Sequence, residues 1–136
     1  MLKNSKDYSS EQILHLADFI NGNESSFLWL TDHCKELAAV ADVITKNDDE
    51  ALDWLKSFSF DKLYMFAIAF LEDFQTSIDY FLKYQDLEWA AVLDACRDNE
   101  TALIWLREKD PAYGQLAVAI LNFDQEQRVR RRNYQR

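Results

Sequence analysis

The two histidines are the side chains of this 136-residue chain best suited to proton transfer or metal binding. His15 follows Glu11 by one helical turn, and Glu36 follows His33 at a similar spacing, so each pair could touch on a helix face. A catalytic or metal site would also require both pairs to meet Cys34 or an aspartate, and nothing in the spacing requires that. We therefore predict no catalytic residue, no metal ligand and no cofactor, and interpret both histidines as ordinary surface or repeat-motif residues.

The cysteines and the apolar segments bear on where the protein resides. Cys34 and Cys96 are the only cysteines, and they form neither a Cys-x-x-Cys motif nor a disulfide framework. The segment Met1–Ser10 is polar and lacks the apolar stretch of a secretory signal. The longest unbroken apolar run, Leu63–Leu71, has nine residues, whereas a membrane span needs about 20. We expect reduced, mostly buried thiols, a cytoplasmic location and no membrane partner.

Other enzymatic signatures are missing from the sequence. Two glycines could hardly form a phosphate-binding loop, and we find no Ser/His/Asp pattern. Many carboxylates, such as Asp48, Asp49 and Glu50, fall where helices are expected to begin, and the positive end of the helix dipole explains them. An enzyme with a His or carboxylate site in a groove is therefore only the third function that we consider.

The charge of the chain is distributed unevenly. The net charge is −9, but five of the 15 basic residues stand in the last nine positions. Residues 1–127 carry ten basic and 24 acidic residues, a net charge of −14. A body this acidic repels nucleic acid and anionic membranes and would suit a basic partner. The same charge is also typical of a protein that is simply kept soluble.

The basic C-terminal tail is the sharpest local feature. Its cations are Arg128, Arg130, Arg131, Arg132 and Arg136. They could contact RNA, DNA or anionic lipid. They could instead pair with an acidic partner or with the acidic body of this protein. A third interpretation is a solvated helix end, whose cations complement the negative end of the helix dipole. We name Arg128, Arg130, Arg131 and Arg132 as candidate partner-binding residues.

An internal repeat of about 25 residues organises the chain. An aromatic residue recurs at spacings of 25, 26 and 25, each with an apolar residue two positions before it and another directly after it. These residues are Trp29, Trp54, Tyr80 and Trp105. We call the segments that carry them the Trp helices, and we expect the aromatic side chains to be core residues rather than a row that stacks a ligand.

A second series lies between the Trp helices. A small residue recurs at spacings of 24, 26, 24 and 26, with an apolar residue four positions before it. Three positions after it the residue is also apolar, except at Asp94, where the adjacent Leu93 could take the role. This spacing is one face of an α-helix. The segments are named the Ala helices after Ala17, Ala41, Ala67, Ala91 and Ala117.

Capping signals agree with short helices at these places. The paired residues Ser9 and Gln12, and Asn47 and Glu50, have the spacing of a capping box, and Gly22 is placed to end the first helix. Asp110 before Pro111 is typical of a helix start, and Asp124 with Gln127 predicts a separate last helix that leads into the basic tail.

Parts of the chain resemble ankyrin repeats. The sequence Leu14-His15-Leu16-Ala17, a Gly-centred turn at residues 21–23 and the apolar segment Phe27–Leu30 resemble an ankyrin helical pair, and Leu87–Ala91 with Leu103–Leu106 resemble a second copy. The period near 25 residues leaves no room for the β-turn finger of an ankyrin repeat, which has about 33 residues. The resemblance implies a stacked helical array that binds proteins, and it identifies no binding residue.

These observations together predict an all-α protein. We expect a right-handed, α-solenoid-like stack of short antiparallel helical hairpins with about nine to ten helices. Residues 1–9 would form an N-terminal arm, residues 10–124 the helical repeat domain, and residues 125–136 a basic C-terminal helix or tail. The expected function is non-catalytic binding of another protein, as an adaptor, inhibitor or immunity-type protein. The alternative is a nucleic-acid-associated accessory protein acting through the Arg-rich tail, and the sequence leaves the oligomeric state open.

Overall fold

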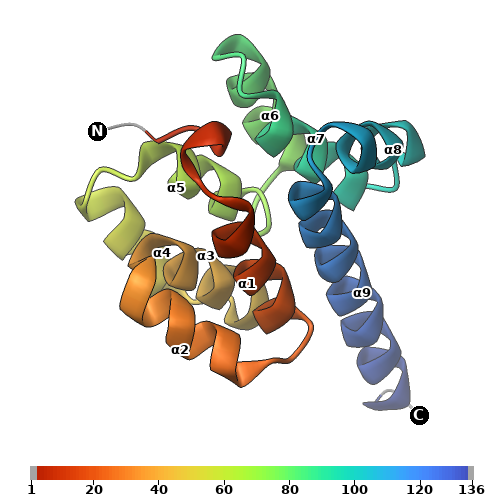
Figure 1. Cartoon of the computed structure of the whole chain (residues 1–136). Coiled ribbons are helices and arrows are strands. Elements are labelled where there is room, and N and C mark those ends of the chain that lie inside the picture. Colours follow the sequence, from red (N-terminus) through yellow and green to blue (C-terminus); the bar gives the residue numbers. More distant parts are fainter. Residues whose placement is uncertain (1–2, 135–136) are drawn as a thin grey trace.

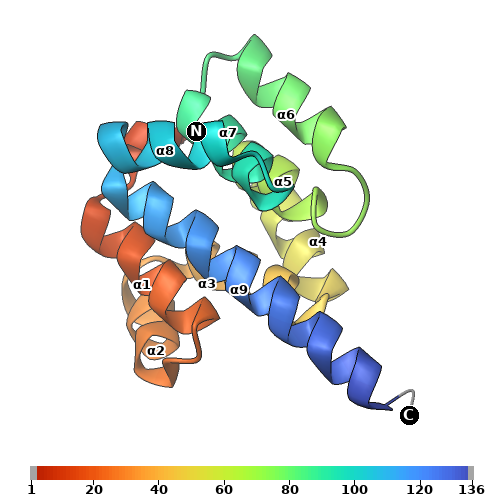
Figure 2. The same cartoon turned by 90° about the vertical axis from the view of Figure 1, so that its right-hand side faces the viewer.

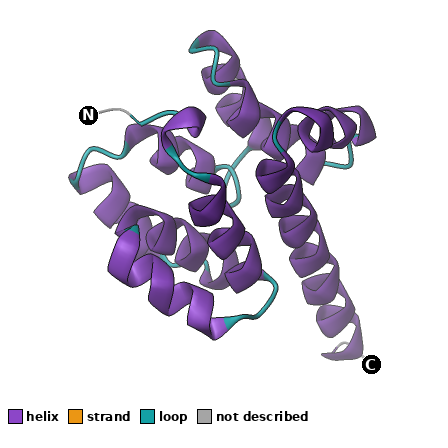
Figure 3. Cartoon of the chain, in the orientation of Figure 1, coloured by secondary structure: helices purple, strands orange, loops and turns teal. Residues whose placement is uncertain are grey.

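The computed structural model describes residues 3–134 and the side chains of residues 3–127. Within that range the chain is all-α, as predicted, and Figure 3 shows helices joined by short loops without strands. The elements are a short 3-10 helix, η1 (Ser5–Asp7), and the α-helices α1 (Ser10–Ile20), α2 (Glu24–His33), α3 (Lys35–Lys46), α4 (Asp49–Ser57), α5 (Asp61–Ile68), α6 (Phe74–Lys83), α7 (Leu87–Cys96), α8 (Glu100–Lys109) and α9 (Pro111–Tyr134).

The odd-numbered helices are the predicted Ala helices, and the even-numbered ones are the Trp helices. Most neighbours in the chain pack against each other, including α1 on α2, α3 on α4, α6 on α7 and α8 on α9. Helices this short are not stable alone, so each depends on the face that it buries against its neighbours. The alternation of the two kinds of helix agrees with the sequence analysis.

The stack closes on itself, which a linear array would not do. The most extensive helix–helix contact in the described range joins α1 to α9, whose first residues lie about 100 positions apart in the sequence. Figures 1 and 2 both show these two helices side by side, with the C-terminal part of α9 extending beyond the other helices. The predicted solenoid-like stacking is therefore not confirmed. Closure covers the apolar face of the first helix, which in an open stack would meet water.

The position that anchors each Trp helix is the residue after the aromatic one. Leu30, Leu55, Phe81 and Leu106 are all fully buried. The four aromatic residues of the series themselves are only partly buried and pack at the edge of the core. The expected burial of this row is thus correct in part, because the aromatic rings lie between the core and the solvent.

The Ala register holds in four of the five Ala helices and fails in α7. Ala17, Ala41, Ala67 and Ala117 are buried, whereas Ala91 is partly exposed. In α7 the buried face carries Trp89, Val92 and Leu93 instead. Nearly every residue of α7 is apolar, so its own sequence does not fix which face turns inward, and the neighbouring helices decide.

The N-terminal arm is folded onto the body. Ser5 donates its backbone N–H to Oδ1 of Asp86 over 3.1 Å and its hydroxyl to Oε2 of Glu88 over 2.8 Å. The hydroxyl of Tyr113 donates to the carbonyl oxygen of Ser5 over 2.6 Å, and Nζ of Lys62 lies 3.4 Å from Oδ2 of Asp86. These contacts join the arm to α7 and α9.

The predicted caps are confirmed in part. Ser9 and Gln12 form a reciprocal capping box, and Gly22 has a φ of 105°, in the region that glycine adopts without strain. Asn47 does not cap α4; it ends α3 in the left-handed region with a φ of 53°, and Asp48 accepts the amide hydrogens instead.

The predicted last helix does not start at Asp124. The helix α9 runs without a break from Pro111 to Tyr134, so the expected boundary between residues 124 and 125 falls inside it. The side chains of Arg128, Arg130, Arg131 and Arg132 lie outside the described residues.

Candidate functional site

An apolar groove lies over α7, between α6 and α8. It has a volume of about 350 Å³. Its apolar lining comes from one face of each helix, and the polar residues lie near the connection between α7 and α8. The lining residues are Ile78, Leu82, Leu87, Ala90, Ala91, Asp94, Asn99, Thr101, Ala102 and Trp105.

The unusual register of α7 creates this groove. The positions that the repeat assigns to the core, Leu87, Ala91 and Asp94, line the groove instead. Asp94, which breaks the apolar pattern of the sequence, accepts hydrogen bonds from Nε of Arg97 over 3.1 Å and Nδ2 of Asn99 over 2.8 Å. The departure from the repeat thus marks a surface position with its own local polar contacts.

Exposed apolar side chains collect around the same three helices. Six large hydrophobic residues of the described range are exposed, and four of them lie on α6, α7 or α8 or directly after α6. These four are Leu82, Tyr84, Leu87 and Ile104, of which Leu82 and Leu87 line the groove. Single exposed apolar residues need no explanation, but exposed leucines that line one groove are typical of a binding surface.

The partly buried aromatic row differs at this place as well. In the first three Trp helices the aromatic residue packs against a ring four positions later: Trp29 against His33, Trp54 against Phe58 and Tyr80 against Tyr84. The residue four positions after Trp105 is Lys109, which has no ring. Trp105, which lines the groove, therefore lacks the neighbouring ring that packs against Trp29, Trp54 and Tyr80.

The two histidines lie on opposite faces of one indole. The imidazole of His15 stacks on Trp29 with 4.1 Å between ring centroids, and that of His33 stacks with 4.4 Å. Nδ1 of His15 lies 3.1 Å from the hydroxyl of Ser26, and Nδ1 of His33 donates to the carbonyl oxygen of Trp29 over 2.9 Å.

Neither predicted His–carboxylate pair is among these contacts. Glu36 lies in α3, beyond the end of the helix that carries His33, and Nζ of Lys3 donates to it over 2.9 Å. Burial acts to raise the pKa of Glu36, but the hydrogen bond from Lys3 and further hydrogen bonds outweigh it and hold that pKa below its usual range. The described residues hold no group of three His, Cys, Asp or Glu side chains placed to bind a metal ion together.

The two thiols have different surroundings. Cys34 is buried, and burial together with the nearby carboxylate of Glu36 raises its pKa to about 12. Cys96 is partly buried beside a second recess, between α3, α7 and α9. Both are free thiols, as the sequence predicts.

None of the helices in the described range combines the length and apolar character that crossing a membrane requires.

Comparison with protein-family models, curated proteins and solved structures finds no match to this chain. The resemblance to ankyrin repeats therefore stays a prediction that no relative tests.

Proposed function

We propose that this protein is a non-catalytic protein-binding module, and that its groove over α7 receives an amphipathic, basic helix of the partner. The observation that carries the proposal is a mostly apolar groove that holds Leu82 and Leu87, two of the six exposed large apolar residues of the described range. Leu82, Leu87 and Trp105 are the groove residues that would contact the apolar face of the partner.

The shape of the groove favours a helix as the occupant. Its lining runs along α7 from Leu87 to Asp94, eight residues or about 12 Å of helix, and residues of α6 and α8 line the rest of it. A helix packs into such a space with apolar residues at i, i+3, i+4 and i+7. Two turns of a partner helix would fill it.

The charge of the protein favours a basic partner. Residues 1–127 carry a net charge of −14, and the only charged residue in the groove lining is Asp94. Lysine or arginine residues beside the apolar stripe of the partner would be attracted by this acidic body, and more so at low ionic strength. An acidic helix with the same apolar stripe would be repelled.

A pair of model peptides tests the proposal. One is a helical peptide with leucine at every third or fourth position and lysine at the others, and its counterpart has glutamate in place of lysine. We expect saturable binding of the lysine peptide by fluorescence anisotropy. Leu87→Asp should weaken it at least tenfold, because burial of one leucine contributes about 1.5–3 kcal/mol.

Leu28→Asp is the matched control, because it adds the same charge at an exposed leucine in α2, away from the groove. Circular dichroism and urea unfolding check that both variants fold. If both variants weaken the lysine peptide equally, or if the two peptides bind equally well, the groove is not the binding site. A single-stranded RNA oligonucleotide is a third probe, and its binding in preference to both peptides would support the alternative function through the Arg-rich tail.

A further inference from the structure

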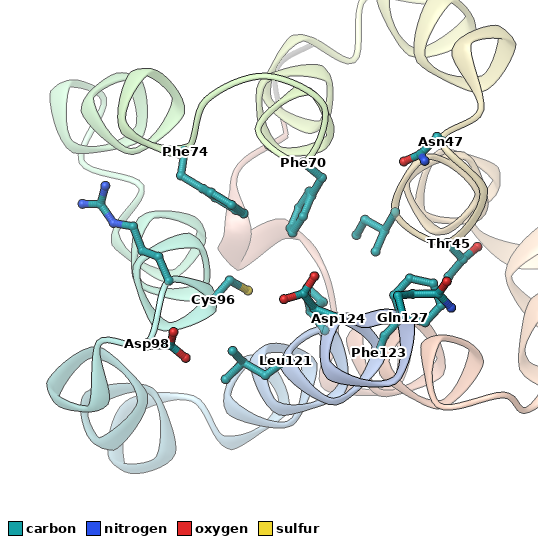
Figure 4. A pocket seen from close by; sticks show the side chains of 13 residues that line it. Thr45, Asn47, Phe70, Phe74, Cys96, Asp98, Leu121, Phe123, Asp124 and Gln127 are labelled. Atoms are coloured by element: carbon teal, nitrogen blue, oxygen red, sulfur yellow. The ribbon is translucent and has the colours of Figure 1, made fainter. Parts of the chain in front are cut away.

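A second recess, of about 410 Å³, lies on another part of the molecule. The end of α3, the connection between α5 and α6, the end of α7 and the middle of α9 surround it (Figure 4). Its size is within the range typical of pockets for small ligands. The lining residues are Ile44, Thr45, Asn47, Phe70, Phe74, Cys96, Arg97, Asp98, Ile120, Leu121, Phe123, Asp124 and Gln127.

Aromatic rings form part of its wall. Phe70, Phe74 and Phe123 line the recess, and all three are only partly buried. The rings of Phe70 and Phe74 stand nearly perpendicular, with 5.2 Å between centroids and 84° between planes. Figure 4 shows both rings entering the pocket from the same side. Two perpendicular rings make a corner whose faces carry negative electrostatic potential.

Carboxylates lie across the pocket from this corner. Asp98 follows the end of α7 with a φ of 68°, and Asp124 comes from α9. Burial raises the pKa of the Cys96 thiol, and the negative charges of Asp124 and Asp98 raise it further. Arg97, the one cation among the described lining residues, is held by Asp94 with an Nε–Oδ1 distance of 3.1 Å. Two carboxylates therefore act on the part of the pocket where Cys96 lies.

Aromatic faces and carboxylates around one space match the chemistry of a particular cation. An alkylated ammonium group has an apolar surface that phenyl rings can contact, and a positive charge that their faces and nearby carboxylates attract. A small hydrated metal ion would gain little from the rings, and a neutral apolar molecule would gain nothing from the carboxylates. We propose that this pocket binds an alkylated ammonium group, from a free quaternary amine or from the side chain of a methylated lysine.

Two probes and their neutral counterparts test this proposal. Choline is compared with 3,3-dimethylbutan-1-ol, which has the same shape without the charge. A peptide with one trimethyl-lysine is compared with the same peptide carrying norleucine. Binding is followed through the NMR signals of the pocket methyl groups of Ile44, Ile120 and Leu121. We expect choline, the trimethyl-lysine peptide or both to bind at least five times more tightly than the neutral counterpart, and the one that binds identifies the source.

Conservative variants locate the binding. Phe74→Leu keeps an apolar side chain but removes one π face, and should weaken binding about five- to thirtyfold. Asp98→Asn keeps a residue type that tolerates the left-handed conformation and should also weaken binding. The controls are Phe58→Leu and Asp53→Asn, which change exposed residues of the same types outside the lining.

Three results would overturn the proposal. The first is equal binding of the charged probe and its neutral counterpart, which would make the pocket merely apolar. The second is absence of binding by both charged probes. The third is an equal effect of the pocket variants and their controls. None of these results depends on the groove over α7, so the two proposals succeed or fail separately.

Discussion

The closed packing of α1 against α9 can be tested by overpacking one small residue. Ala117 is fully buried in α9, the helix that contacts α1, α7 and α8. Ala117→Leu adds three carbon atoms at a site that is fully buried. Overpacking of this kind costs about 1–3 kcal/mol, because neighbouring side chains and helices must shift.

The expected readout is hydrogen exchange of the backbone amides of α1. In a closed packing, loosening α9 uncovers α1, so its slow amides should exchange about five to 150 times faster, the factor that corresponds to about 1–3 kcal/mol. In an open stack, α1 would be the far end of the array and would not respond. Native-state exchange measured by NMR at low denaturant reports this opening separately from global unfolding.

Ala67→Leu is the matched control. Ala67 is also fully buried, but its helix α5 packs against α3, α4 and α6. This variant should accelerate exchange in those helices and affect α1 less. If α1 exchanges at the wild-type rate in Ala117→Leu, or if both variants accelerate it equally, the reasoning from α1–α9 contact is refuted.

Further predictions concern single buried groups. Leu106→Ala should lower the free energy of unfolding by about 2–5 kcal/mol, because Leu106 is fully buried. Ile104→Ala, on the exposed side of the same helix, should change it by less than about 1 kcal/mol. Urea unfolding measures both, and equal losses would contradict the role of Leu106 as the anchor of α8. Tyr113→Phe should cost about 1–3 kcal/mol in the same assay, since the buried carbonyl of the arm loses its donor; a neutral result would mean that the arm is not held by this bond. Raising the pH should destabilise the fold. Burial is the main reason why the pKa values of Tyr8, Tyr113 and Cys34 are raised in the folded protein, so the unfolded chain releases these protons at lower pH. Once the pH exceeds the pKa of a group in the unfolded chain, from about pH 9 upward, that group should lower the free energy of unfolding by roughly 1.4 kcal/mol per pH unit. Thermal melts between pH 8 and pH 11 that show no decline would contradict the burial of these groups.

Local features were predictable from the sequence because they depend on neighbours in the chain. The capping box of Ser9 and Gln12 and the turn at Gly22 follow from backbone hydrogen bonding within a few residues. The 25-residue period predicted the alternation of helices. The same reasoning failed at Asp124, because a residue that can cap a helix is also tolerated inside one that the preceding turns have already started.

The candidate groove was only partly visible in the sequence. Asp94 was recognised as a departure from the repeat, and Trp105 differs from the rest of its row by the lysine four positions later. Both are departures from the repeat that fall at one surface of the molecule, but neither predicts a groove, because the residues that line it come from three different helices. The rotation of α7, which buries Trp89 and leaves Ala91 partly exposed, could not be predicted, since an almost uniformly apolar helix has several faces that could turn inward.

Helical periodicity and caps are local properties, so the order of the residues was enough to predict short α-helices of two alternating kinds. The packing of the helices against one another sets the rest: α1 closes onto α9, α7 presents Leu87 and Ala91 to an open groove, and one pocket is lined by Phe70, Phe74, Asp98 and Asp124. Each of these arrangements joins segments that are distant in the sequence. They are set by which combination of helix faces buries the most apolar surface at once, and no single segment carries that information.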